Sequence, residues 1–71
     1  MQARFTASTL HTNYTIHSGQ MVEVRQLSWT SLFEITAEDG WVGVTISDEL
    51  SECSPDLNLL IAKQRILGEA V

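Results

Sequence analysis

Apolar and polar residues alternate through the first two thirds of the chain, and this period of two is typical of half-buried β-strands. In the first stretch Phe5, Ala7 and Thr9 share one face and alternate with polar neighbours. The alternation predicts strands over residues 4–9, 14–17, 22–27, 31–37 and 41–46. Residues 1–46 are therefore expected to form an antiparallel sheet of four or five short strands.

A turn signal separates the last two of these strands. Glu38-Asp39-Gly40 lies between two alternating runs, and the Asp-Gly pair accepts the positive φ angles of a hairpin turn. We therefore expect residues 31–37 to pair antiparallel with residues 41–46. Three side chains of the second strand share one face, Val42, Val44 and Ile46, and the opposite face carries Trp41, Gly43 and Thr45.

The pattern changes to a helical one at Ser54-Pro55-Asp56. These residues supply a capping hydroxyl, a proline suited to the first turn and an acid favoured by the helix dipole. Gly68 is typical of a helix end, so the helix is expected over residues 54–67. Another short turn of helix is expected between Ser47 and Cys53.

The predicted helix is apolar on two sides. Its larger stripe consists of Leu57, Leu60, Ile61 and Leu67. The second stripe, nearly opposite, consists of Leu59, Ala62 and Ile66. Because so short a chain has few elements with which to cover both sides, we expect a second chain to cover the second stripe. The alternatives are that residues 1–20 or 47–53 wrap over it, or that its side chains are singly exposed.

Length and cysteine content agree with association. A chain of 71 residues makes one small domain, residues 1–71, and domains of this size usually need disulfides, a metal or oligomerisation for stability. Cys53 is the single cysteine, so no disulfide can form within the chain. The expected partner is therefore a second copy, giving a homo-oligomer, or another protein.

The charge balance argues against nucleic acid and membrane as partners. The net charge is −5 with only four basic residues, whereas binding to nucleic acid or to an anionic membrane surface needs a basic patch. The carboxylates are concentrated between Glu34 and Asp56, an acidic band that suits a protein partner better. No apolar run is long enough to span a bilayer, and no signal peptide is recognisable, so a cytoplasmic location is expected.

Residues that could carry chemistry are few. Cys53 stands beside the predicted helix start, but nearby carboxylates are expected to raise the pKa of its thiol. His11 and His17 have no metal-ligand spacing and are expected on the surface of a polar strand. Asp48 and Glu52, four residues apart, lack the rest of a calcium loop. We therefore expect no catalytic residue, no metal and no cofactor, and a protein that is not an enzyme.

Two tryptophans are further candidates for a binding surface. If the Val42 face is the core face, Trp41 is exposed beside Gly43, and Trp29 is a candidate to join it. Large aromatic side chains are enriched where proteins bind one another. The alternative is that Trp41 packs under the C-terminal helix or closes a barrel end. The candidate partner-binding residues are Leu59, Ala62, Ile66, Trp41 and Trp29.

Two segments resemble the bacterial form of the Src-homology-three-like small barrel. They are residues 16–24, Ile-His-Ser-Gly-Gln-Met-Val-Glu-Val, and the later triplet Gly40-Trp41-Val42. In that family a turn glycine precedes a V-x-V strand, and a G-W-V triplet closes a later hairpin. The resemblance covers about residues 16–50; the family's N-terminal strand pattern is absent, and the apolar helix is an addition. It implies a module that binds peptides or cell-wall fragments.

These observations predict a mainly-β (α+β) fold: a curled four- or five-stranded antiparallel sheet, or a small Src-homology-three-like barrel, followed by one C-terminal helix. The expected function is that of a non-catalytic protein-interaction or oligomerisation module. Two alternatives stay open. One is a barrel-type binder of small molecules or peptides, and the other is an enzyme whose site forms between subunits from His11, His17 and carboxylates.

Overall fold

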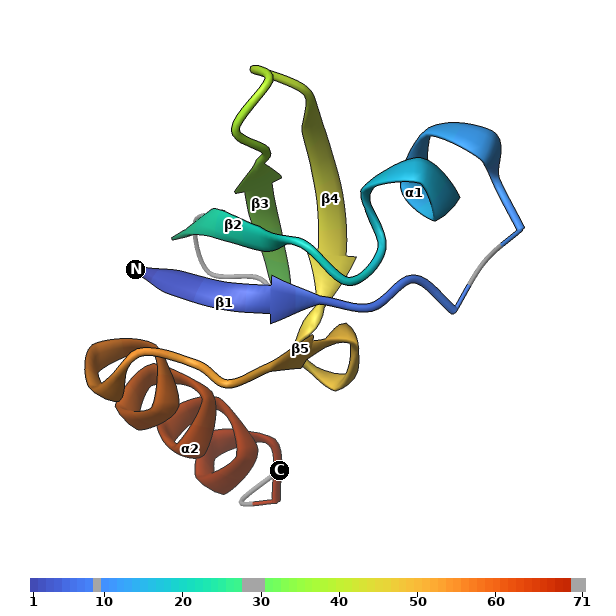
Figure 1. Cartoon of the computed structure of the whole chain (residues 1–71). Coiled ribbons are helices and arrows are strands. Elements are labelled where there is room, and N and C mark those ends of the chain that lie inside the picture. Colours follow the sequence, from blue (N-terminus) through green and yellow to red (C-terminus); the bar gives the residue numbers. More distant parts are fainter. Residues whose placement is uncertain (9, 28–30, 70–71) are drawn as a thin grey trace.

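The computed structural model describes residues 1–8, 10–27 and 31–69, which form one curled sheet with two helices beside it (Figure 1). The elements in chain order are β1 (Gln2–Phe5), α1 (Thr12–His17), β2 (Met21–Gln26), β3 (Leu32–Thr36), β4 (Val42–Ile46), the 3₁₀ turn η1 (Ser47–Glu49), β5 (Leu50–Ser51) and α2 (Pro55–Glu69).

The five strands are ordered β4-β3-β2-β1-β5, and every pairing is antiparallel. The sheet curls into a half-barrel whose edges are β4 and β5, and α2 lies beside β1 and β5 (Figure 1). This confirms the predicted fold class, a curled antiparallel sheet followed by a C-terminal helix. The half-barrel is compatible with a Src-homology-three-like fold.

The β3–β4 hairpin turns at the predicted residues. Gly40 has a φ of +93°, and its N–H donates to the carbonyl of Ala37 at 3.0 Å. The Ala37 N–H in turn donates to the carbonyl of Trp41 at 2.8 Å. The Asp39 carboxylate accepts the Trp41 N–H at 2.9 Å, so the turn is stabilised by a side chain as well as by the backbone.

Replacing Gly40 with alanine is expected to lower the free energy of unfolding by about 1–2 kcal/mol, because a Cβ disfavours positive φ. The space around Gly40 is open, so this cost is conformational and not steric. Urea denaturation followed by circular dichroism measures it. Gly68→Ala is the control: Gly68 lies within α2, where alanine favours the helix. Equal losses in both variants would contradict a specific need for glycine at the turn.

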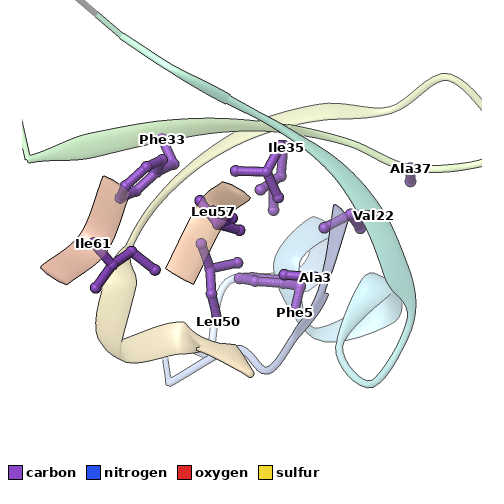
Figure 2. Close-up of a cluster of buried hydrophobic side chains, with 10 residues drawn as sticks. Ala3, Phe5, Val22, Phe33, Ile35, Ala37, Leu50, Leu57 and Ile61 are labelled. Atoms are coloured by element: carbon purple, nitrogen blue, oxygen red, sulfur yellow. The ribbon is translucent and has the colours of Figure 1, made fainter. Parts of the chain in front are cut away.

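The core fills the space between the concave side of the sheet and the near side of α2 (Figure 2). Its largest fully buried side chains are Phe5 of β1, Phe33 and Ile35 of β3, and Leu57 of α2. The smaller or less completely buried members are Ala3, Val22, Val24, Ala37, Leu50 and Ile61. Every strand except β4 contributes an apolar side chain to this cluster.

β4 turns its valines away from the core, so the condition under which Trp41 would be exposed is not met. Val42, Val44 and Ile46 are 54%, 42% and 43% exposed, while Gly43 and Thr45 are buried. The pairing explains this orientation: Gly43 lies opposite Ile35, and Thr45 lies opposite Phe33. The bulky β3 residues occupy the core there, so their β4 partners must be small.

Residues 14–17 are helical, whereas a strand was predicted. Thr15 donates both its backbone N–H and its hydroxyl to the carbonyl of His11, each at 3.0 Å. At the end of α1, Nδ1 of His17 lies 2.7 Å from the carbonyl of Asn13, one turn earlier. These local bonds favour a helical turn.

β1 ends at Phe5, earlier than the predicted residue 9. The N–H of Ala7 donates to the hydroxyl of Ser18 at 3.0 Å, and the N–H of Ser8 donates to the Glu49 carboxylate at 2.7 Å. Beyond β1 the backbone therefore bonds to the Glu49 carbonyl, through the Thr6 N–H, and to side chains, in place of a neighbouring strand. Thr9 lies outside the described residues.

α2 starts where the sequence indicates and continues past the predicted end. Its N-terminal residue is Pro55, and the helix includes Gly68, so that glycine does not stop it. Ser54 acts differently from a simple cap: its hydroxyl donates to the Asp56 carboxylate at 2.6 Å and accepts the Gln2 N–H at 3.2 Å. The start of α2 is thereby bonded to β1.

Between β4 and α2 the chain forms the predicted short turn, η1, and then a strand that was not predicted. β5 pairs with β1 through Arg4 opposite Ser51 and Phe5 opposite Leu50. Two residues are too few for a period of two to be recognisable. β5 nevertheless gives β1 a second neighbour and places Leu50 in the core.

Candidate functional site

The two predicted faces of α2 have different environments. Leu57 is fully buried and Ile61 is 8% exposed, so this side of the helix closes the core. On the other side Leu59 and Ile66 are 68% and 66% exposed, and Ala62 is exposed between them. We call Leu59, Ala62 and Ile66 the outer face of α2. No described part of the chain covers Leu59 or Ile66, and the Leu67 side chain lies outside the described set.

A second exposed apolar surface lies on the convex side of the β3–β4 hairpin. Leu32 pairs with Ile46 and is 39% exposed. With Val42 and Val44 these residues form an apolar row, which we call the hairpin row. It is bordered by an ion pair in which one guanidinium nitrogen of Arg25 lies 3.1 Å from both carboxylate oxygens of Glu34.

Trp41 packs inward, in agreement with the alternative considered for it. Its ring covers Gly43, where an added Cβ would lie 2.5 Å from Cη2 of the indole. The Trp41 ring also lies edge-on to Tyr14 at 5.0 Å between centroids and 6.5 Å from Phe5. The side chain is half-buried against the core. Trp29 lies outside the described residues.

His17 is the least expected member of this aromatic cluster. The ring is only 6% exposed and stacks on Trp41, with centroids 4.3 Å apart and planes 8° apart. Nε2 lies 2.9 Å from the Asp39 carboxylate, and Nδ1 faces the Asn13 carbonyl. The sequence predicts a surface imidazole at this position, and this prediction is wrong, because His17 is buried. His11 is exposed as expected, and its ring lies 5.6 Å from that of Tyr14.

The pKa shifts of His17 and Asp39 follow from these contacts. The hydrogen bond to the Asn13 carbonyl, followed by the bond to Asp39, raises the pKa of His17 above its ordinary value of 6.5, although burial opposes the shift. The Trp41 N–H and then the His17 ring lower the pKa of Asp39 below its ordinary value. Each partner therefore favours the charged form of the other.

Tyr14 connects α1 to the edge of the sheet. Its hydroxyl accepts the backbone N–H of Val44 at 3.1 Å, and its ring lies 6.0 Å from that of Phe5. Val44 pairs with β3 on its other side. α1 therefore satisfies a backbone donor that would otherwise be open at the β4 edge.

Glu49 joins three segments in a second polar cluster. Its carboxylate accepts the hydroxyl of Thr45 at 2.6 Å and both the N–H and the hydroxyl of Ser8, at 2.7 and 2.9 Å. Burial acts to raise the pKa of Glu49, but these hydrogen bonds outweigh it and hold the pKa below its ordinary value. The cluster is held by complementary donors within the chain, and we assign it a structural role.

The other residues considered for chemistry do not converge. Burial raises the pKa of the Cys53 thiol, where repulsion from carboxylates was expected to do so. Glu52 forms an ion pair with Arg4, whereas Asp48 lies in η1, so the two acids are not on one helical turn. Within the described ranges no three His, Cys, Asp or Glu side chains gather at a distance suited to a metal. Neither helix, over the same ranges, has the length and apolar character needed to cross a bilayer.

Sequence reasoning missed the contact between His17 and Asp39 because 22 residues separate them. Two local signals are consistent with it in retrospect. Asn13 and His17 are four residues apart, which suits a helical turn and not a strand. Asp39 precedes Gly40 in a hairpin turn, where its side chain commonly accepts a backbone N–H two residues later.

Comparison with known proteins finds no relative of this chain. No protein-family model, no curated protein and no solved structure matches the chain.

Proposed function

We propose that the protein is a non-catalytic association module that forms a homo-oligomer through the outer face of α2. The observation that carries this proposal is the exposure of Leu59 and Ile66, 68% and 66%, on a helix whose opposite side is core. Apolar side chains exposed in a row on one face mark an interaction site more often than scattered ones do. The small size of the chain adds support, because association extends a small core.

The spacing of the outer face suits a second copy of the same helix. Leu59 and Ile66 are seven residues apart, with Ala62 between them. In an antiparallel helix pair, Leu59 of one copy would pack against Ile66 of the other, and the small Ala62 side chains would meet near the crossing and allow a close approach. Such a contact is self-complementary, as a two-fold interface requires.

Light scattering across a concentration series tests the proposal. We expect the mass to rise from 7.9 kDa toward twice that value as the concentration reaches the high micromolar range. The Leu59→Glu, Ile66→Glu double variant is expected to stay monomeric and folded, because it places two carboxylates in the interface without touching the buried side of α2. A mass of 7.9 kDa for the natural chain at every concentration would exclude self-association.

The matched control is Arg65→Glu, which changes the net charge by the same amount as the double variant. Arg65 is exposed on α2 and lies about 120° around the helix from Leu59 and about 100° from Ile66. This control is expected to associate like the natural chain. Dissociation by Arg65→Glu as well would mean that general charge repulsion, and not the outer face, governs the oligomer.

A peptide-binding barrel is the second candidate, and the hairpin row favours it. Val42, Val44 and Ile46 present a continuous apolar strip along an edge strand, a surface on which an extended apolar segment could lie. Val44→Glu tests which surface mediates association: the mass is expected to rise with concentration as in the natural chain if α2 is the interface, and to stay at the monomer value if the hairpin row is. Support for an enzyme site between subunits is weaker, because both ring nitrogens of His17 are already bonded within their own chain.

A further inference from the structure

Both ring nitrogens of His17 face hydrogen-bond acceptors. Nδ1 lies 2.7 Å from the backbone carbonyl of Asn13, which has no proton to donate. Nε2 lies 2.9 Å from one oxygen of Asp39, whose other oxygen accepts the N–H of Trp41. A neutral imidazole has one donor and one acceptor nitrogen, whereas the imidazolium has two donors. The arrangement therefore needs the protonated ring, and only that form satisfies both contacts.

The indole of Trp41 also favours the charged form of the His17 ring. His17 stacks on the Trp41 indole at 4.3 Å between centroids, and a cation is attracted to the face of an indole. His17 is 6% exposed, while the Asp39 side chain is 66% exposed, so the ring is shielded by Trp41 on one face and the carboxylate stays in contact with solvent. The neutral ring would lose one hydrogen bond, the ion pair and the cation–π attraction together.

The segment that His17 holds in place covers the β4 edge. α1 carries Tyr14, whose hydroxyl accepts the Val44 N–H and whose ring packs on Trp41. The direction of that N–H follows from the ladder: Ala37 and Trp41 form a hydrogen-bonded pair, so by alternation Val44 directs its N–H away from β3. Without Tyr14 this donor is open at the edge.

We propose that α1 is a strap over the β4 edge which protonated His17 holds closed, and which opens when His17 loses its proton. Opening replaces the Tyr14 contact with an open backbone donor at Val44. The device couples the proton concentration to the availability of a sheet edge, and it does so independently of whether the outer face of α2 binds a second copy.

The charged and titratable groups around the ring agree with this assignment. From the β3–β4 hairpin, Asp39 provides the charge that acts on His17. From β1, the guanidinium of Arg4 donates to the carbonyl of Gly19 at 2.7 Å and is itself paired with Glu52. Tyr14 and His11 are the other titratable side chains of the α1 segment. Asp39 is therefore the partner that favours the charged ring.

The sign of the pH dependence follows from the two shifts. Because the pKa of His17 is raised in the folded chain, the closed strap is fully stabilised below the ordinary value of 6.5 and loses this stabilisation as the pH rises through the folded pKa. Asp39 has a lowered pKa, so its contribution is lost only as the pH falls through a value below 3.8. The strap is held most firmly between pH 3.8 and pH 6.5.

Nuclear magnetic resonance on the natural chain tests the proposal directly. The ¹⁵N shifts of the His17 ring report its protonation, and the hydrogen-exchange protection factor of the Val44 amide reports strap closure. As the pH rises, we expect the protection factor to fall by at most about tenfold per pH unit between the unfolded and folded pKa values of His17, in step with the ring shifts. Thr45, whose N–H faces β3 by the same alternation, is the internal control and is expected to keep its protection.

Two variants sharpen the test. Asp39→Asn keeps an acceptor for the Trp41 N–H but removes the charge, and it is expected to move the opening transition to lower pH. His11→Gln removes the exposed histidine and is expected to leave the transition where it is. The proposal is overturned if the His17 ring is neutral at pH 5, if the Val44 protection factor stays constant while the ring deprotonates, or if Asp39→Asn leaves the transition unmoved.

Discussion

Replacing Leu57 with alanine is expected to lower the free energy of unfolding by about 2–5 kcal/mol. The side chain is fully buried and belongs to the core cluster that lies between α2 and the sheet, so truncation removes apolar burial and leaves a cavity. Domains of this size have a total stability of roughly 4–10 kcal/mol. The variant is therefore expected to unfold at a much lower urea concentration, as measured by circular dichroism at 25 °C.

Leu59→Ala is the matched control for this change. It removes the same atoms from the same helix two residues later, but from a side chain that is 68% exposed. Its effect on a monomeric sample is expected to be within about 0.5 kcal/mol. If Leu59→Ala cost as much as Leu57→Ala at a concentration where the protein is monomeric, the assignment of the two sides of α2 would be wrong.

Replacing Gly43 with valine is expected to destabilise the chain by about 1–3 kcal/mol, the usual cost of overpacking. The new Cβ would lie 2.5 and 2.8 Å from Cη2 and Cζ2 of Trp41, so the indole must leave its place. Trp41 would then lose its stacking on His17. In a Trp29→Phe background, where Trp41 is the single indole, its emission is expected to shift to longer wavelength as the ring becomes exposed.

A double-mutant cycle separates the clash from other effects of the substitution. In a Trp41→Ala background the indole is absent, so Gly43→Val is expected to lose most of its cost. A cost that persists in that background would show that the valine is incompatible with the β4 backbone or with Ile35 across the ladder, and would contradict the clash with Trp41 as its cause.

The features that the sequence predicts well are those determined by neighbouring residues. Asp39-Gly40 forms a turn through the backbone freedom of one glycine and the acceptor of one side chain. Pro55 begins α2 as expected. The exposure of Leu59 and Ile66 also follows from local information, because helical periodicity places them opposite Leu57 whatever the rest of the chain does.

The features that the sequence does not predict depend on contacts between distant residues. Alternation in β4 separates Val42 and Val44 from Gly43 correctly, but it does not say which set faces the core. That choice is made by Phe33 and Ile35 on the neighbouring strand, and by Trp41 folding over Gly43. The sequence also does not predict α1. A helix of six residues is only marginally stable on its own, and α1 depends on the contact between His17 and Asp39.

The position of β1 between β2 and β5 has a consequence for how the chain folds. The backbone of Gln2 bonds to Ser54, 52 residues further along the chain, so a strand near the beginning of the sequence is complete only when residues near its end arrive. Closing so long a loop costs entropy before it gains contacts. The β3–β4 hairpin can form early in folding from local contacts, whereas the β1–β5 ladder and the packing of α2 against the sheet must form late. Folding of this small half-barrel is therefore expected to be limited by that closure, and to be slower than its 71 residues would suggest.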